Sequence, residues 1–129
     1  MVRPLLTSSA HAFHIDEQPV RDIAVLELHG DADLHAAPEL RERLNAAIDG
    51  QTAGVVVDLS DVTFLDSTAL GVLVGGMKRL RATRRPLRLA APRTEIRRLL
   101  EITLLDRVLG VDPTREDSLA VVAPRAGRF

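Results

Sequence analysis

Residues 55–76 read VVVDLSDVTFLDSTALGVLVGG, and they contain the clearest indication of the fold class. Its first five residues, 55–59, are almost wholly apolar, which is typical of a strand covered on both faces in a parallel sheet. After Phe64 and Leu65 the apolar residues recur at helical spacing as far as about Thr83. A buried strand that leads into an amphipathic helix indicates layered α/β structure. The apolar stripe of this helix consists of Leu70, Leu73, Val74, Met77 and Leu80.

Strands and helices alternate on either side of this stretch. Residues 23–28, IAVLEL, predict a strand, and the segment 30–33, GDAD, predicts a turn. Pro38 suits the first turn of a helix that ends at Asp49 and Gly50. Further strands are expected at 12–16, 87–90 and 108–111, and further helices after Pro92 and over 118–122. The alternation predicts an α/β fold, an open sheet whose strands are joined by crossover helices.

The bulk composition fits one soluble domain. A chain of 129 residues suits a single domain, which we expect over 12–123, with a flexible leader at 1–11 and a basic tail at 124–129. The net charge of −1 and the three phenylalanines, with no Trp or Tyr, argue against nucleic acid as a partner. No apolar run approaches the roughly 20 residues that span a bilayer. We therefore expect a cytoplasmic protein with neither a membrane nor a nucleic acid as partner.

Ser67 stands where the helix after Phe64 and Leu65 is expected to begin, and it has two interpretations. Its hydroxyl can cap the helix by accepting a hydrogen bond from a free backbone N–H group. The same helix end, with its unpaired donors and positive dipole, can also tolerate a phosphate. A phosphoserine there would add a charge of about −1.5 to −2, which a partner docked at this helix end would encounter.

The residues around Ser67 resemble a known family. Residues 58–60, DLS, and 64–71, FLDSTALG, resemble the signature of STAS domains of the bacterial anti-sigma factor antagonist type. The segment 30–33, GDAD, is similar to a second conserved turn of that family. The resemblance covers about residues 12–122. One departure is Ala69, because many members have glycine there.

The resemblance implies both a fold and a mechanism. The fold would be a small open mixed sheet of about four or five strands, with helices packed mainly on one face. An anti-sigma factor that is also a serine kinase would phosphorylate Ser67, and a metal-dependent serine phosphatase would reverse this. The unphosphorylated protein, a monomer or weak dimer without cofactor or catalytic activity, would bind the anti-sigma factor and release a sigma factor. The expected partner surface consists of Gly30, Asp31, Asp33, Leu34, Leu65, Asp66, Ser67, Thr68, Ala69 and Leu70.

Other functions are open to a domain of this kind. STAS-like domains also serve as scaffolds in stress-sensing assemblies and as accessory subunits of lipid-transport complexes, without a phosphoserine. A hydrolase would need Ser67 in a G-x-S-x-G elbow and a late histidine. Asp66 and Thr68 do not fit that elbow, and no histidine follows His35. Thr68 is a second hydroxyl beside the expected phosphosite.

Two further patterns have structural interpretations. A metal site needs three or more converging ligands, so we expect His11, His14, His29 and His35 to be solvated surface residues and no metal site. Glycines inside the helix do not form a nucleotide fingerprint, because that motif must open a helix. We expect Gly71 and Gly75 to permit close contact with the sheet or with another helix.

Overall fold

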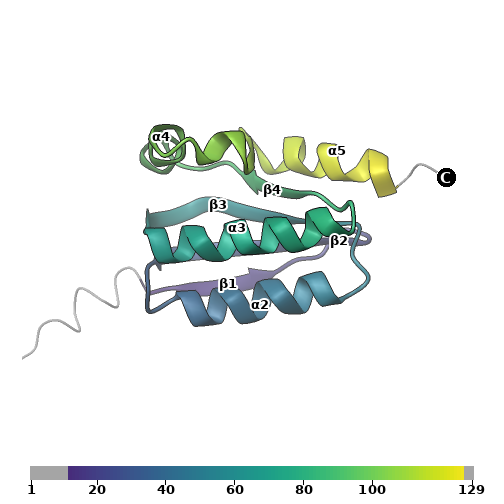
Figure 1. The fold of residues 1–129 in the computed structure, drawn as a ribbon, viewed down its shortest axis with the longest axis horizontal. Coiled ribbons are helices and arrows are strands. Elements are labelled where there is room, and N and C mark those ends of the chain that lie inside the picture. Colours follow the sequence, from purple (N-terminus) through teal and green to yellow (C-terminus); the bar gives the residue numbers. More distant parts are fainter. Residues whose placement is uncertain (1–11, 127–129) are drawn as a thin grey trace, which may run out of the picture.

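The structure is a computed structural model that describes residues 12–126. The expected leader, 1–11, and the last three residues lie outside the described part of the chain. Strands and helices alternate from the second strand onward, in agreement with the sequence pattern (Figure 1). The elements are β1 (His14–Glu17), β2 (Ile23–Ala32), α2 (Ala37–Asp49), β3 (Gly54–Leu65), α3 (Ser67–Ala82), β4 (Leu87–Ala90), α4 (Thr94–Ile102), the 3₁₀ helix η1 (Leu105–Arg107), β5 (Gly110–Asp112) and α5 (Arg115–Ala126).

The five strands form one mixed sheet in the order β1-β2-β3-β4-β5. β1 pairs with β2 in antiparallel fashion, and every later pair is parallel. Parallel neighbours need a crossover, and helices α2, α3 and α4 lie within the crossovers that connect them. The expected small mixed sheet is confirmed.

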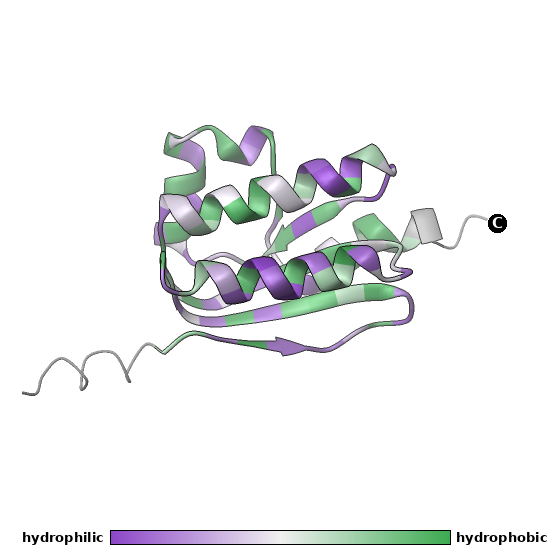
Figure 2. Cartoon of the chain, turned by 60° about the horizontal axis from the view of Figure 1, so that its bottom comes forward, coloured by the Kyte–Doolittle hydropathy of each residue, from purple (hydrophilic) through white to green (hydrophobic). Residues whose placement is uncertain are grey.

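Two apolar clusters show which helices cover which face of the sheet. The larger cluster joins α2, α3 and α4 to one face through residues such as Leu40, Leu73 and Leu100. The smaller cluster lies on the other face, where Val122 of α5 packs against Val25 and the rest of its apolar row. Hydrophilic and hydrophobic residues follow one another along the helices (Figure 2), and the buried residues of α2 and α3 are all apolar or glycine. Within residues 12–126, helices therefore cover mainly one face, as expected, and α5 covers part of the second.

Strands β2 and β3 extend further than the apolar pattern predicted. β2 continues through Ala32, so Gly30, Asp31 and Ala32 are strand residues and the expected turn at 30–33 is wrong for them. The two strands pair as far as Ala32 and Leu65, with register shifts on either side of Gly30. Gly30 has a φ of 87°, which suits glycine at such an irregularity. The polar ends of the two strands are thus held by pairing with each other.

Close contact between α2 and α3 occurs at Gly76. A Cβ atom on Gly76 would lie 2.5 Å from Leu44 Cδ2 and 3.5 Å from Ile48 Cδ1. A Cβ atom on Gly71 or Gly75 would meet nothing within 4 Å, so the expected role of those two glycines is wrong. The close contact with α2 is made by Gly76, one position beyond Gly75.

A polar cluster holds α5 against the sheet edge. Arg88 donates from Nε and Nη2 to the two carboxylate oxygens of Asp112, at 2.9 and 2.8 Å, and Ser118 Oγ donates to the same carboxylate at 2.7 Å. The Arg88 hydrogen bonds hold the pKa of Asp112 below its ordinary value. α5 starts at Arg115 and continues to Ala126, so the helix is longer than the expected 118–122 and includes the start of the expected tail.

Candidate functional site

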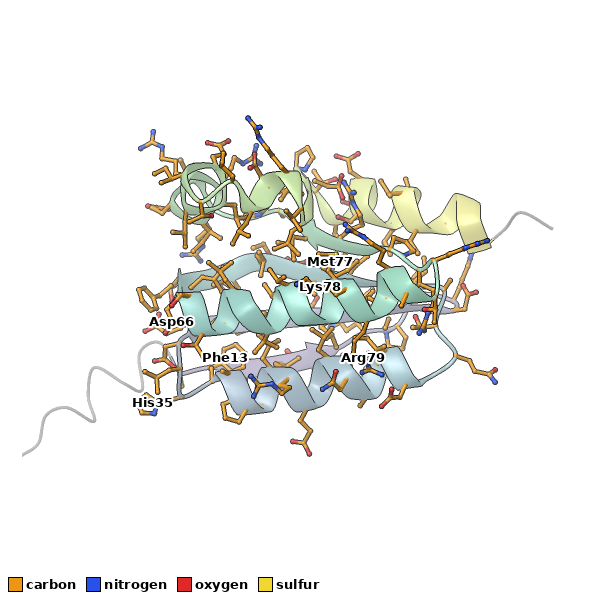
Figure 3. All side chains as sticks on the ribbon, viewed as in Figure 1. Phe13, His35, Asp66, Met77, Lys78 and Arg79 are labelled. Atoms are coloured by element: carbon orange, nitrogen blue, oxygen red, sulfur yellow. The ribbon has the colours of Figure 1, made fainter. Side chains whose placement is uncertain are left out.

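The candidate site lies where β2 and β3 end side by side. Ala32 and Leu65 are register partners at the last positions of these strands, and Asp66 N–H donates to the Ala32 carbonyl at 3.2 Å. The carboxyl ends of parallel strands meet at one edge of a sheet, so the segments that follow them are neighbours. Figure 3 shows Asp66 and His35 at this same end of the molecule. The two segments that resembled the family signature are thereby brought together.

Asp66, and not Ser67, caps helix α3. The Asp66 carboxylate accepts a hydrogen bond from Ala69 N–H at 3.0 Å, and Asp66 has the extended backbone of an N-cap residue. The interpretation of Ser67 as the cap is therefore wrong. Ser67 is the first helical residue and is exposed, as is Thr68. Their N–H groups belong to the first turn and have no acceptor within the helix.

We expect Asp66→Ala to lower the free energy of unfolding by about 1 kcal/mol, because the Ala69 N–H loses its acceptor. Urea denaturation followed by circular dichroism measures this. Ser67→Ala is the matched control and should change the free energy by less than about 0.5 kcal/mol, since it removes an exposed hydroxyl that is not the cap. An equal loss in both variants would contradict this assignment of the cap.

Asp33 shapes the neighbouring segment between β2 and α2. Its Oδ1 accepts from the N–H groups of His35 at 3.0 Å and Ala36 at 3.1 Å, and its carbonyl accepts from Ala36 and Ala37. These bonds define a tight turn. Leu34 lies in the turn with 58% of its surface exposed. Asp33 therefore holds the backbone in a form that presents Leu34 to solvent.

The expected partner surface divides by burial. Leu34, Ser67 and Thr68 are exposed, and Gly30, Asp31, Asp33 and Asp66 are partly buried. Leu65, Ala69 and Leu70 are buried, with at most 5% exposure, so their side chains pack beneath the surface and are not available to a partner. The sequence pattern could not separate these two groups, because helix and strand ends mix inward and outward positions.

Phe64 is an exposed apolar residue that was not among the expected contact residues. Half of its surface is accessible, although it stands inside β3 beside the buried Leu65. A phenylalanine in an apolar strand normally indicates a core residue. Its exposure at the end of the sheet depends on the irregular pairing of β2 with β3, which the sequence does not show.

The histidines differ in their environments. His14 has 59% of its side chain exposed, in agreement with the expected solvated residue, but His29 retains only 23%. His29 Nδ1 lies 2.6 Å from Asp61 Oδ2. This hydrogen bond raises the pKa of His29, and it lowers the pKa of Asp61. The expectation of a solvated histidine is wrong for His29; His11 lies outside the described residues.

Comparisons with known proteins agree with this architecture. The family model of the STAS domain matches residues 14–118. The anti-sigma-B factor antagonist of Staphylococcus aureus is 33% identical over 91 residues, which cover 70% of this chain and 84% of that protein. Within residues 12–126, no helix is both long enough and apolar enough to cross a membrane.

Two solved structures share the fold. An anti-sigma factor antagonist from Mycobacterium paratuberculosis aligns with a TM-score of 0.75 and 27% identity, covering 87% of this chain and 95% of that one. The Bacillus cell fate determinant SpoIIAA in the phosphorylated form aligns with a TM-score of 0.65 and 25% identity, covering 86% of this chain and 99% of that one. The sequence motifs, the fold and these matches agree, and the chain therefore belongs to the STAS domain family, among the anti-sigma factor antagonists.

Proposed function

We propose that this protein is a phosphorylation-gated anti-sigma factor antagonist. The unphosphorylated form binds an anti-sigma factor that is also a serine kinase, and the sigma factor is released. Phosphorylation of Ser67 abolishes this binding, and a metal-dependent serine phosphatase restores it. The observation that carries the proposal is the exposed Ser67 hydroxyl at the first position of α3, in a helix already capped by Asp66.

The accessible side chains define a contact surface at the end of the sheet. Leu34 is an exposed apolar group, and Ser67 and Thr68 are exposed on the adjacent helix end. Beside these exposed residues, Leu65 and Leu70 are buried in the main core. An apolar side chain beside uncharged hydroxyls gives a small patch of the kind that a protein partner can cover.

A phosphate on Ser67 would be compatible with the fold but would weaken partner binding. The first turn of α3 contains no acidic side chain, and the positive end of the helix dipole favours an anion there. The partly buried carboxylates of Asp33 and Asp66 lie in the two adjoining segments, so the phosphate adds to a negative rim. A partner that buries this rim would have to desolvate about two further charges.

We further propose how the protein acts and where it acts. The protein acts by binding and not by catalysis, needs no cofactor, and works in the cytoplasm as a monomer or weak dimer. An exposed serine at the start of a helix would give a switch in which no element has to refold.

Intact-mass spectrometry after incubation with ATP, Mg²⁺ and candidate anti-sigma factor kinases tests the phosphosite. We expect one phosphate on the wild-type protein and none on Ser67→Ala, because Ser67 is the exposed hydroxyl at the first helical position. Thr68→Ala is the matched control and should still accept one phosphate. A phosphate that persists in Ser67→Ala and is lost in Thr68→Ala would move the site by one residue. Absence of phosphate with every kinase would favour a scaffold or accessory role.

A further inference from the structure

Three strands place a row of ligand-type side chains on the sheet face opposite α2 and α3. His14 of β1 is the register partner of His29 of β2, and His29 is the partner of Asp61 of β3. Asp16 lies two residues after His14 and therefore on the same face of β1. The intervening Ile15 is buried in the main core, which confirms that the row faces outward. Figure 2 shows the hydrophilic end of β1 at the edge of the sheet.

Three of these side chains converge on one point. His14, Asp16 and His29 each offer one ligand atom, and these atoms all lie within 4.8 Å of one another. Asp16 Oδ2 is 3.2 Å from His29 Nε2 and 3.6 Å from His14 Nε2. Two ligands of one tetrahedral zinc ion stand roughly 3.3 Å apart, given bonds of 2.0–2.1 Å. The two distances to Asp16 therefore already match a shared ion.

The Nε2 atom of His29 is the strongest indication of a ligand. It is buried, and among residues 12–126 no group makes a well-formed hydrogen bond to it, although Asp16 Oδ2 lies 3.2 Å and Glu27 Oε1 3.8 Å away. The opposite ring nitrogen, Nδ1, is engaged by Asp61 Oδ2 at 2.6 Å. A carboxylate on one imidazole nitrogen, with the other nitrogen directed at further ligand-type groups, is the arrangement that orients a metal-binding histidine. A buried polar atom without a well-formed hydrogen bond calls for an explanation, and an ion shared with Asp16 would supply one.

We propose that His14, Asp16 and His29 bind one divalent transition-metal ion of the zinc class, oriented by Asp61. Two imidazoles and a carboxylate suit zinc, and water would supply the fourth ligand. The rings of His14 and His29 are stacked with centroids 4.3 Å apart, and the exposed His14 can turn toward a shared ion at little cost. Glu27 is not a ligand, because Arg115 and Gln18 already engage its two oxygens.

This site is independent of the proposed switch. The ion would join edge strand β1 to β2 on the outer face, whereas Ser67 begins a helix that covers the other face. Ion binding should therefore stabilise the pairing of β1 with β2, whether or not an anti-sigma factor is present. The two proposals can fail separately.

Isothermal titration of the tag-free, EDTA-treated full chain with Zn²⁺ at neutral pH tests the proposal. The background variant carries His11→Ala and His35→Ala, so that only His14 and His29 remain as histidines. We expect one ion per chain in this background, and at least about tenfold weaker binding after His14→Ala, Asp16→Asn or Asp61→Asn. Titration with Co²⁺ should give the visible absorption bands of a tetrahedral ion.

Glu17→Gln is the matched control. It removes the carboxylate next to Asp16 in β1, and that carboxylate pairs with Arg43 and is not one of the proposed ligands. It should leave Zn²⁺ affinity unchanged. Absence of saturable binding in the background variant would overturn the site, as would equal affinity in His14→Ala, Asp16→Asn and the background protein. Circular dichroism confirms that each variant is folded before it is titrated.

Discussion

Ser67→Asp is expected to weaken binding of the anti-sigma factor by at least about tenfold, and the phosphorylated protein by more. A coupling free energy of about 1–3 kcal/mol corresponds to roughly 5–150-fold in affinity, and a charge placed within the interface belongs in the upper part of that range. The aspartate adds one charge next to Asp66, at the end of the sheet where the segment with Asp33 and Leu34 also lies, and phosphate adds about two. Biolayer interferometry with the immobilised partner gives the ratio of dissociation constants.

Two variants separate the switch from unspecific effects of charge. Ser67→Ala should bind within about threefold of the wild type, because it leaves the surface neutral at that position. Gln51→Asp adds the same charge at an exposed position between α2 and β3, at the opposite end of the strands, and should also bind normally. Wild-type affinity in Ser67→Asp and in the phosphorylated protein would show that Ser67 lies outside the interface.

Gly76→Val is expected to lower the free energy of unfolding by about 3 kcal/mol, at the upper end of the range for overpacked cores. Its Cβ would meet Leu44 Cδ2 at 2.5 Å and Cγ at 3.1 Å. Leu44 is only 1% exposed, so its side chain cannot swing away, and α2 must separate from α3. Urea denaturation measures the loss.

Gly75→Val provides the matched control one position earlier in the same helix. A Cβ there meets nothing within 4 Å, so we expect a change within about 0.5 kcal/mol, with the better helix propensity of valine acting in its favour. In the double variant Leu44→Ala/Gly76→Val, the losses should fall short of additivity by at least about 1 kcal/mol, because the smaller side chain makes room. Equal losses at Gly75 and Gly76 would contradict the proposed helix contact.

Local sequence patterns predicted an element correctly where its type and its ends depend on its own residues. The run at 55–59 predicted a covered strand, and all five residues are buried in β3. Residues 87–90 form β4 with the expected ends. The helix after Ser67 follows from the spacing of its apolar residues, and it begins at Ser67 and ends one residue before Thr83. The position of Ser67 at a helix start, on which the proposed switch depends, could therefore be read from the chain alone.

Long-range contacts determined the details that local patterns could not show. Gly30, Asp31 and Ala32 look like a turn, but they are strand residues because β3 pairs with them. Likewise, the sequence contains both Asp66 and Ser67 as suitable helix caps, and only the backbone at the end of β3 selects Asp66. Such choices depend on neighbours that are distant in the chain.

The α/β class, the order of the elements and the placement of Ser67 at the start of a helix follow from local sequence patterns, because apolar periodicity and helix-end chemistry act over a few neighbouring residues. Which residues contact each other across the fold follows from the three-dimensional arrangement alone. It set Gly76 against Leu44, buried Leu65 under the candidate surface, and brought His14 and His29 together across two strands. The physical reason is register: strand pairing and helix packing select one alignment of distant segments, and no local pattern encodes that alignment.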